Sequence, residues 1–257
     1  MIIDTHCHLY DAAFDADRQE VVQRARAVGV AKAILPGIDR SCHEALIRCV
    51  QEFPDFCLPA VGLHPTSVAA NYREELDFVE QQLALQPFVA VGEIGVDGYW
   101  SREFMALQKQ AFETQLHWAA ARKLPVIIHH RDAFNELFDV LMACRQLNLK
   151  GVLHAYSGSY EQYVQLQKCG DFKIGIGGVL TFKNAGLAQL VQKVPSSALL
   201  LETDAPWLSP VPHRGKRNES SYLQLVVSTL AALLGLPVDE ISRITYQNAK
   251  NLFIFED

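Results

Sequence analysis

Histidine and carboxylate residues lie directly after several short apolar runs of this sequence. His6 and His8 are separated by one residue, and in a strand this spacing places both imidazoles on the same side, where they could bind one metal ion. Imidazole with carboxylate suits Zn, Mn, Ni or Fe, and carboxylate with water suits Mg. The candidate metal-binding and catalytic residues in these segments are His6, His8, His64, Glu93, His129, His154, Glu202 and Asp204.

Each of these residues has an ordinary structural explanation when it is considered alone. A single histidine is more often a hydrogen-bonded structural residue than a ligand, Glu93 could be a solvated loop carboxylate, and Asp204 could form a turn before Pro206. Six of the nine histidines lie in these segments, however, and burying so many ionisable groups together is unfavourable unless a cation pairs them. The whole set therefore favours a metal site.

Nucleophilic and nucleotide-binding alternatives have weaker support. The sequence has no GxSxG motif around Ser157, and Gly175, Gly177 and Gly178 match neither a P-loop nor a dinucleotide-binding pattern. These glycines instead predict a backbone that passes close to the site. Cys7 lies between the two histidines and should point to the opposite face of its strand.

Eight apolar runs predict the strands that must position these residues. Several runs are continuous in Val, Ile, Leu and Ala, as expected of parallel strands that are buried on both faces. Helical segments separate them, and no repeat or linker divides the chain, so we predict one domain over residues 1–257. The pattern predicts a TIM (β/α)8 barrel, in which the strand ends meet on one face, with an open doubly wound sheet as the alternative. The predicted strands are Met1–Asp4, Val30–Leu35, Phe56–Val61, Phe88–Gly92, Val126–His129, Gly151–His154, Phe172–Gly175 and Ala198–Glu202.

The helical segments carry their own start and stop signals. Before the first one, Asp17 with Glu20 resembles a capping box. Two helices, over residues 219–234 and 238–253, follow the last strand, with Gly235 as the predicted C-cap between them.

Composition and charge limit the class of protein. The chain has 257 residues, of which 49% are hydrophobic and 20% charged, as in ordinary globular proteins. The net charge of −6 argues against a protein that coats nucleic acid nonspecifically, but it does not exclude an enzyme that acts on nucleic acid. We find no signal peptide, no membrane span and no CxxC pair among the six cysteines, so we expect a cytoplasmic protein with reduced thiols.

Six motifs follow one another along the chain, five of them in the strand-end segments and the last in a basic run beyond Asp204. They are Asp4-Thr5-His6-Cys7-His8, Gly62-Leu63-His64-Pro65, Val91-Gly92-Glu93-Ile94-Gly95, His154-Ala155-Tyr156-Ser157-Gly158, Leu201-Glu202-Thr203-Asp204-Ala205-Pro206 and Arg214-Gly215-Lys216-Arg217-Asn218. As a set they resemble the TatD family of metal-dependent hydrolases.

This resemblance implies a TIM barrel with two divalent metal ions, Mg, Mn or Zn, and hydrolysis of phosphodiester bonds in DNA. It also implies that Glu93 bridges the two ions, while His64 and Glu202 lie close by and face the substrate or support the ligands. The implied ligands are His6, His8, Glu93 and Asp204 for one ion and Glu93, His129 and His154 for the other.

The expected reaction is attack of an activated water on phosphorus. Asp204 is the expected proton acceptor, and His64 could donate a hydrogen bond to a nonbridging oxygen. Arg214 and Arg217 belong to a dense basic run that could bind flanking phosphates or simply form a solvated loop. We expect a monomer that acts on DNA or another phosphodiester. Aromatic residues that could stack a base, or pack in the core, are Tyr99, Trp100, Tyr156 and Trp207.

Two other functions remain open at this point. The same metals could activate water against a carbonyl carbon, as in an amidohydrolase-like enzyme that cleaves an amide, a lactone or an acyl ester on tRNA. Many such enzymes place a carboxylated lysine between the metals, whereas this chain has Glu93 there and no lysine at the ends of the fourth and fifth strands. The second alternative is a non-catalytic metal-binding protein, which would be expected to lack ligands that this sequence retains.

Overall fold

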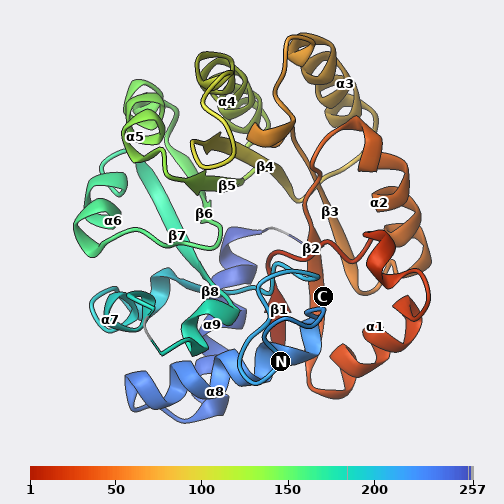
Figure 1. Ribbon diagram of the computed structural model, residues 1–257, viewed down its shortest axis with the longest axis vertical. Helices are drawn as coiled ribbons and strands as arrows, with labels where there is room; N and C mark the ends of the chain where they lie inside the picture. The colour runs from red at the N-terminus through yellow and green to blue at the C-terminus, as the bar shows by residue number, and fades with distance from the viewer. Residues whose placement is uncertain (184, 254, 256–257) are drawn as a thin grey trace.

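Eight parallel strands follow one another around a barrel in the order of the sequence (Figure 1). The computed structural model describes residues 1–183, 185–253 and 255. Each strand pairs in parallel with the next one along the chain. The strands are β1 (Ile2–Asp4), β2 (Val30–Leu35), β3 (Cys57–Val61), β4 (Ala90–Asp97), β5 (Val126–Arg131), β6 (Leu149–Leu153), β7 (Gly170–Ile176) and β8 (Leu199–Leu201).

Hydrogen bonds between the first and last strands close the sheet. The backbone N–H of Thr5 donates to the carbonyl of Leu201 at 2.9 Å, and the N–H of Asp204 donates to the carbonyl of His6 at 2.9 Å. The TIM-barrel prediction is therefore confirmed. The open doubly wound alternative is wrong, because its strand order would reverse at a switch point instead of following the sequence.

Helices form the outer ring of the barrel (Figure 1). Seven of them, α1 to α7, each connect one strand to the next, and α8 and α9 follow β8. The described helices are α1 (Arg18–Ala27), α2 (Arg40–Glu52), α3 (Tyr72–Leu85), α4 (Met105–Arg122), α5 (Phe134–Ala143), α6 (Tyr160–Leu166), α7 (Leu187–Val191), α8 (Leu223–Leu234) and α9 (Val238–Leu252).

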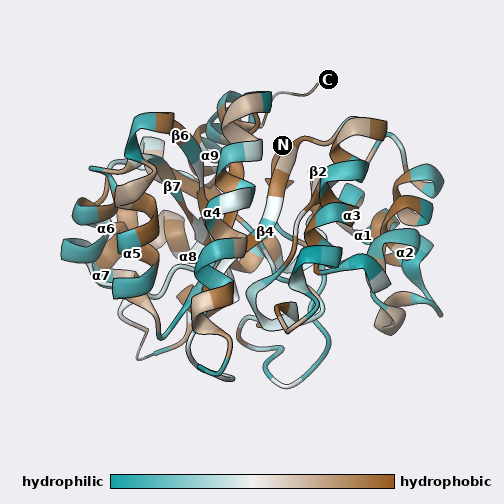
Figure 2. Ribbon diagram, turned by 90° about the horizontal axis from the view of Figure 1, so that it is seen from above, coloured by the Kyte–Doolittle hydropathy of each residue, from teal (hydrophilic) through white to brown (hydrophobic). Residues whose placement is uncertain are grey.

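The barrel interior is filled by apolar side chains of the strands, among them Ile3, Ile34 and Ile127, each at most 2% exposed. Leu252 and Phe253, at the end of α9, pack in the same cluster and cover one end of the barrel. Figure 2 shows this end of α9 on the same side as the N-terminus, with the longer loops on the opposite side. The open end is therefore the one where the strands finish, which is where barrel enzymes carry their sites.

All eight predicted strands are present, although β4 and β5 continue further than predicted. β4 runs past Gly92 to Asp97, and β5 runs to Arg131. The two extensions pair with each other, with Gly95 opposite His129. Polar side chains ended the apolar pattern in the sequence, but the ladder continues because its hydrogen bonds come from the backbone.

The predicted helix signals had different outcomes. Gly235 ends α8 in the left-handed conformation, at φ 65°, as predicted. Asp17 precedes α1, but its side chain caps no backbone N–H, so the capping-box interpretation is wrong. Its carboxylate instead accepts hydrogen bonds from two nitrogens of Arg217, both at 2.7 Å, and from Arg24 at 3.2 Å. Both carboxylate oxygens of Asp17 are therefore occupied by guanidinium donors, which are strong partners for an ionised carboxylate.

No single helix in the described part of the chain is long and apolar enough to cross a membrane. The segments Ser220–Leu234 and Val238–Leu252 meet the criteria of length and composition only as a pair that is bent by 107°. Both segments also contribute buried core residues, such as Leu230 and Ile241.

Candidate metal centre

Two histidines that follow β1 converge with two carboxylates at the open end of the barrel. The Nε2 atoms of His6 and His8 are 3.0 Å apart. Glu93 Oε2 lies 3.2 Å from His6 Nε2 and 3.9 Å from His8 Nε2, and Asp204 Oδ1 lies 3.7 and 3.5 Å from the same two atoms. Asp204 has φ 58°, a left-handed conformation that aspartate tolerates better than most residues. Four potential ligand groups thus face one another.

The tautomer of His8 follows from its outward hydrogen bond. Tyr10 donates its hydroxyl proton to the carbonyl of Pro36 at 2.7 Å. The hydroxyl oxygen lies 2.8 Å from His8 Nδ1 and can only accept there, so Nδ1 carries the proton. The lone pair of Nε2 therefore points toward Glu93 and Asp204, as a metal ligand requires.

Glu93 also faces a second group of histidines with its other oxygen. Glu93 Oε1 lies 2.9 Å from Nδ1 of His129 and 3.4 Å from Nε2 of His64. The opposite nitrogen of His129, Nε2, is 2.8 Å from Asp97 Oδ2, and Asp97 is 1% exposed. A carboxylate behind a histidine fixes the ring and makes the facing nitrogen a better ligand.

His64 has the opposite tautomer from His8. The backbone N–H of Thr66 donates a hydrogen bond to His64 Nδ1 at 3.2 Å. A protonated ring nitrogen could not accept this bond, so Nδ1 carries no proton. Burial holds the pKa of His64 below its usual value, which keeps the ring neutral. The proton therefore sits on Nε2, which makes His64 a hydrogen-bond donor toward the site more readily than a metal ligand.

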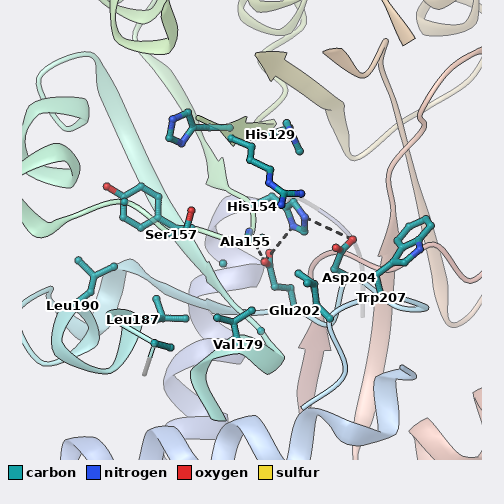
Figure 3. A pocket seen from close by; sticks show the side chains of 18 of the residues that line it. His129, His154, Ala155, Ser157, Val179, Leu187, Leu190, Glu202, Asp204 and Trp207 are labelled. Carbon is teal, nitrogen blue, oxygen red and sulfur yellow. Dashed lines mark hydrogen bonds and ion pairs between the residues drawn. The ribbon is translucent and has the colours of Figure 1, made fainter. Parts of the chain in front are cut away.

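His154 lies between the carboxylates of Glu202 and Asp204 (Figure 3). His154 Nδ1 is 3.1 Å from Glu202 Oε1, and its Nε2 is 3.7 Å from Asp204 Oδ1. The His154 ring stacks on His6 with centroids 3.4 Å apart. A Cβ at Gly175 would come within 3.0 Å of the Glu202 carboxylate, so the predicted close passage of the backbone is confirmed at this position.

Charges within the site set its protonation. Burial would lower the pKa of His129 and His154, but Asp97 and Glu93 raise that of His129 to about 9, and Glu202 and Asp204 raise that of His154 to about 10. Burial would raise the pKa of Glu93, but the charge of His154 and the hydrogen bond from His129 hold it well below the usual value. The site is therefore a cluster of ionised carboxylates balanced by imidazolium groups when no cation is bound.

The donor set fits divalent cations. Among the described residues, ligand atoms of His6, His8 and Glu93 lie within 4.8 Å of one another, and so do those of the group with Glu93, His64 and His129. His6 Nδ1 and Glu202 Oε2 are buried atoms without a hydrogen-bond partner in the described part of the chain. Imidazole and carboxylate are the ligands that divalent transition metals prefer.

The structure brings all eight candidate site residues to this end of the barrel but groups one differently from the expectation. His154 lies closest to His6 and Glu202, not to the group of Glu93 and His129. The Nδ1 atom of His154 forms an ion pair with Glu202 Oε1 at 3.1 Å.

The two candidate arginines do not line the cavity above the site. Arg217 donates to Asp17 and to the carbonyl of Ala13, so its guanidinium holds the loop after β8 against α1. Arg214 packs over the ring of Phe182, with 4.2 Å from the guanidinium carbon to the ring centroid. The described residues that line the cavity include one arginine, Arg131, and one lysine, Lys193.

Two residues that support the site were not predicted. Asp97 lies on the same face of β4 as Glu93, four residues away, and the strand period of two could have identified it had the strand been extended to residue 97. Tyr10 follows His8 by two residues but lies in a turn beyond the isolated bridge of Cys7, so the extended period of two no longer applies there. Tyr10 contacts Nδ1 of His8 and Asp97 contacts Nε2 of His129, in each case the ring nitrogen that faces away from the other ligand groups.

An Asp97→Asn variant is expected to bind metal about 10- to 100-fold more weakly, because the ring of His129 loses its charged partner. The measurement is metal affinity by competition with a fluorescent chelator. Asp139→Asn, at an exposed position of α5, is the matched control and should bind metal as the wild type does. An unchanged affinity in Asp97→Asn would show that this contact does not orient a ligand.

Comparisons with known proteins agree with this geometry. A family model described as "TatD related DNase" matches residues 3–254. The chain is 37% identical over 254 residues to the "Uncharacterized metal-dependent hydrolase YabD" of Bacillus subtilis, covering 98% of this chain and 99% of that protein. It is 32% identical to a "3'-5' ssDNA/RNA exonuclease TatD" of Dickeya dadantii, covering 98% and 97%. The solved structure of YjjV, a TatD homologue of Escherichia coli, superposes with a TM-score of 0.92 at 31% identity, covering 99% and 98%.

Proposed function

This chain belongs to the TatD-related DNase family of metal-dependent hydrolases, and on that premise we propose that it is a nuclease that hydrolyses phosphodiester bonds in DNA. The observation that carries the proposal is the position of Glu93. Its two carboxylate oxygens face two different histidine groups, which is the arrangement that a bridging ligand between two cations needs. Paired divalent cations are a common device of nucleases and phosphatases.

The proposal assigns the cations to residues of this chain. Glu93 would bridge two ions of Mg, Mn or Zn, and these ions would supply Lewis-acid stabilisation of phosphate oxygens and a lowered pKa of water. The ligands would be His6, His8, Glu93 and Asp204 on one side and Glu93, His129 and His154 on the other. His154 lies beside His6 and Glu202 in the structure, so it would have to move toward Glu93 and His129 to complete the second set. The tautomer of His8 and the position of Asp97 behind His129 support these assignments.

Asp204 is the proposed proton acceptor for the attacking water. Burial would raise its pKa, but His154 and the other histidines hold the pKa of Asp204 below its usual value, so the carboxylate is ionised and able to accept a proton. His64 is the proposed hydrogen-bond donor to a nonbridging phosphate oxygen, because its Nε2 carries the proton. Glu202 would position His154.

Further parts of the proposal concern the protein as a whole. We propose a monomer of one domain over residues 1–257 in the cytoplasm. The six cysteines are all free thiols in the structure, as is usual in reducing compartments, which supports this location. The relative in Dickeya dadantii is named for single-stranded DNA and RNA, so single-stranded DNA is the first substrate to test.

Removal of the metal tests the proposed function. The protein is stripped with a chelator and assayed against 5′-labelled single-stranded DNA and bis-p-nitrophenyl phosphate, with Mg, Mn or Zn added back. We expect activity to fall to background in the stripped protein and to return with at least one metal. If metal binds stoichiometrically and neither substrate is cleaved with any metal, the proposal fails and a carbonyl ester or lactone becomes the substrate to test.

A further inference from the structure

The cavity above the metal centre is larger than a phosphodiester group requires. Its volume is about 1090 Å³, slightly above the range of roughly 300–1,000 Å³ that is typical of small-molecule sites. It extends from the histidines to a wall formed by α7 and the turn that follows β7 (Figure 3). We call this extension the apolar lobe and define it by Tyr156, Tyr160, Val179, Leu187 and Leu190.

The lobe is built by short elements that place apolar side chains side by side. Leu187 and Leu190 are three residues apart on α7 and therefore share one face of that helix. Figure 3 shows both leucines and Val179 on the side of the cavity away from His129 and Trp207. The hydroxyl of Tyr156 donates to the carbonyl of Ser159 at 2.9 Å, which holds its ring in place.

The charges of the cavity divide it into two parts. The ionised carboxylates and histidines lie at the metal centre, whereas the five residues of the lobe carry no charge at neutral pH. A phosphate therefore belongs at the metal centre. Lys193 and Glu161, which also line the cavity, carry opposite charges at the edge of the lobe, with the Lys193 ammonium 5.8 Å from the centroid of the Tyr160 ring. The exposed Ser157 and Gln189, which also line the cavity, offer a hydroxyl and an amide near the apolar wall.

We propose that the apolar lobe binds the nucleobase of a nucleotide adjoining the scissile phosphate. This inference rests on the proposed nuclease function. A base is a neutral, flat group with polar edges, so its faces match the apolar wall and its edges match Ser157 and Gln189. The phosphate at the metal centre and the base in the lobe would be parts of one nucleotide, because the same cavity holds both subsites.

The test compares dTpdT with the same dinucleotide in which both sugars are abasic, at saturating metal. The wild type is expected to show a kcat/KM at least roughly ten-fold higher for dTpdT, as stacking of one base supplies. Val179→Trp places an indole in the lobe from a half-buried position, where it fills the space for the base, and should reduce this ratio to about one. Ser157→Trp, at an exposed position that lines the same cavity, serves if Val179→Trp does not fold.

Val164→Trp is the matched control, because Val164 is 41% exposed on α6 and does not line the cavity. It should leave the ratio at the wild-type value. A wild-type ratio near one, or a ratio that the lobe variants leave unchanged, would overturn the base subsite while the nuclease function stands. If the wild type cleaves neither dinucleotide nor bis-p-nitrophenyl phosphate with any metal, the proposed function fails first, and the two failures are thereby distinguished.

Discussion

An Asp204→Asn enzyme is expected to cleave phosphodiester substrates about 10²- to 10⁴-fold more slowly than the wild type. The asparagine amide cannot take the proton of the attacking water, although it occupies nearly the same volume as the carboxylate. Asp204 also faces His6, His8 and His154, at 3.5 to 3.7 Å, so one cation loses an anionic ligand. The measurement is kcat/KM on bis-p-nitrophenyl phosphate with metal in excess.

Metal content separates the two roles of Asp204. The group of Glu93 and His129 does not include Asp204, so the variant should retain at least part of its metal. Asp171→Asn, an exposed carboxylate near the start of β7 at the opposite end of the barrel, is the control and should keep full activity. Activity within three-fold of the wild type in Asp204→Asn would rule out this residue as the proton acceptor.

The parts of the fold that follow a local period could be predicted from the sequence. The apolar runs predict all eight strands, and the spacing of His6 and His8 places both on one face of the chain. The convergence of these residues with Glu93 and Asp204 then follows from closing a parallel barrel in sequence order. The local sequence pattern and the strand order of the barrel are therefore sufficient to predict this part of the site.

Contacts between segments far apart in the chain could not be predicted in this way. Arg217 pairs with Asp17, 200 residues earlier, and nothing in either segment indicates that the loop after β8 packs on α1. A basic run therefore suggested phosphate binding where the structure has an ion pair. The apolar lobe could not be predicted either, because it depends on how α7 packs against the turn after β7.

Protonation states also depend on partners that the sequence does not bring together. His8 and His64 are both strand-end histidines, yet Tyr10 leaves a lone pair on Nε2 of His8, whereas Thr66 leaves a proton on Nε2 of His64. One ring is therefore suited to bind a cation and the other to donate a hydrogen bond. A difference of one hydrogen-bond partner assigns different chemistry to residues of the same type.

A Glu93→Gln enzyme is expected to lose more than Asp204→Asn, because Glu93 is the carboxylate shared by both groups. It contacts His6 and His8 through Oε2 and His64 and His129 through Oε1, at 2.9 to 3.9 Å, and it is 3% exposed. A neutral amide offers neither oxygen as an anionic ligand. We expect metal content to fall below one ion per chain and kcat/KM to fall further than in Asp204→Asn, by about 10⁴-fold or more.

The metal-free form of the same variant gives a reading that does not depend on activity. Glu93 helps to raise the pKa of His129 to about 9, so its neutralisation should lower that pKa, as followed by NMR titration of the imidazole. Glu80→Gln, an exposed residue of α3, is the control for loss of one negative charge. If Glu93→Gln kept two tightly bound ions per chain, Glu93 would not be the bridge, and the two histidine groups would have to bind their ions independently.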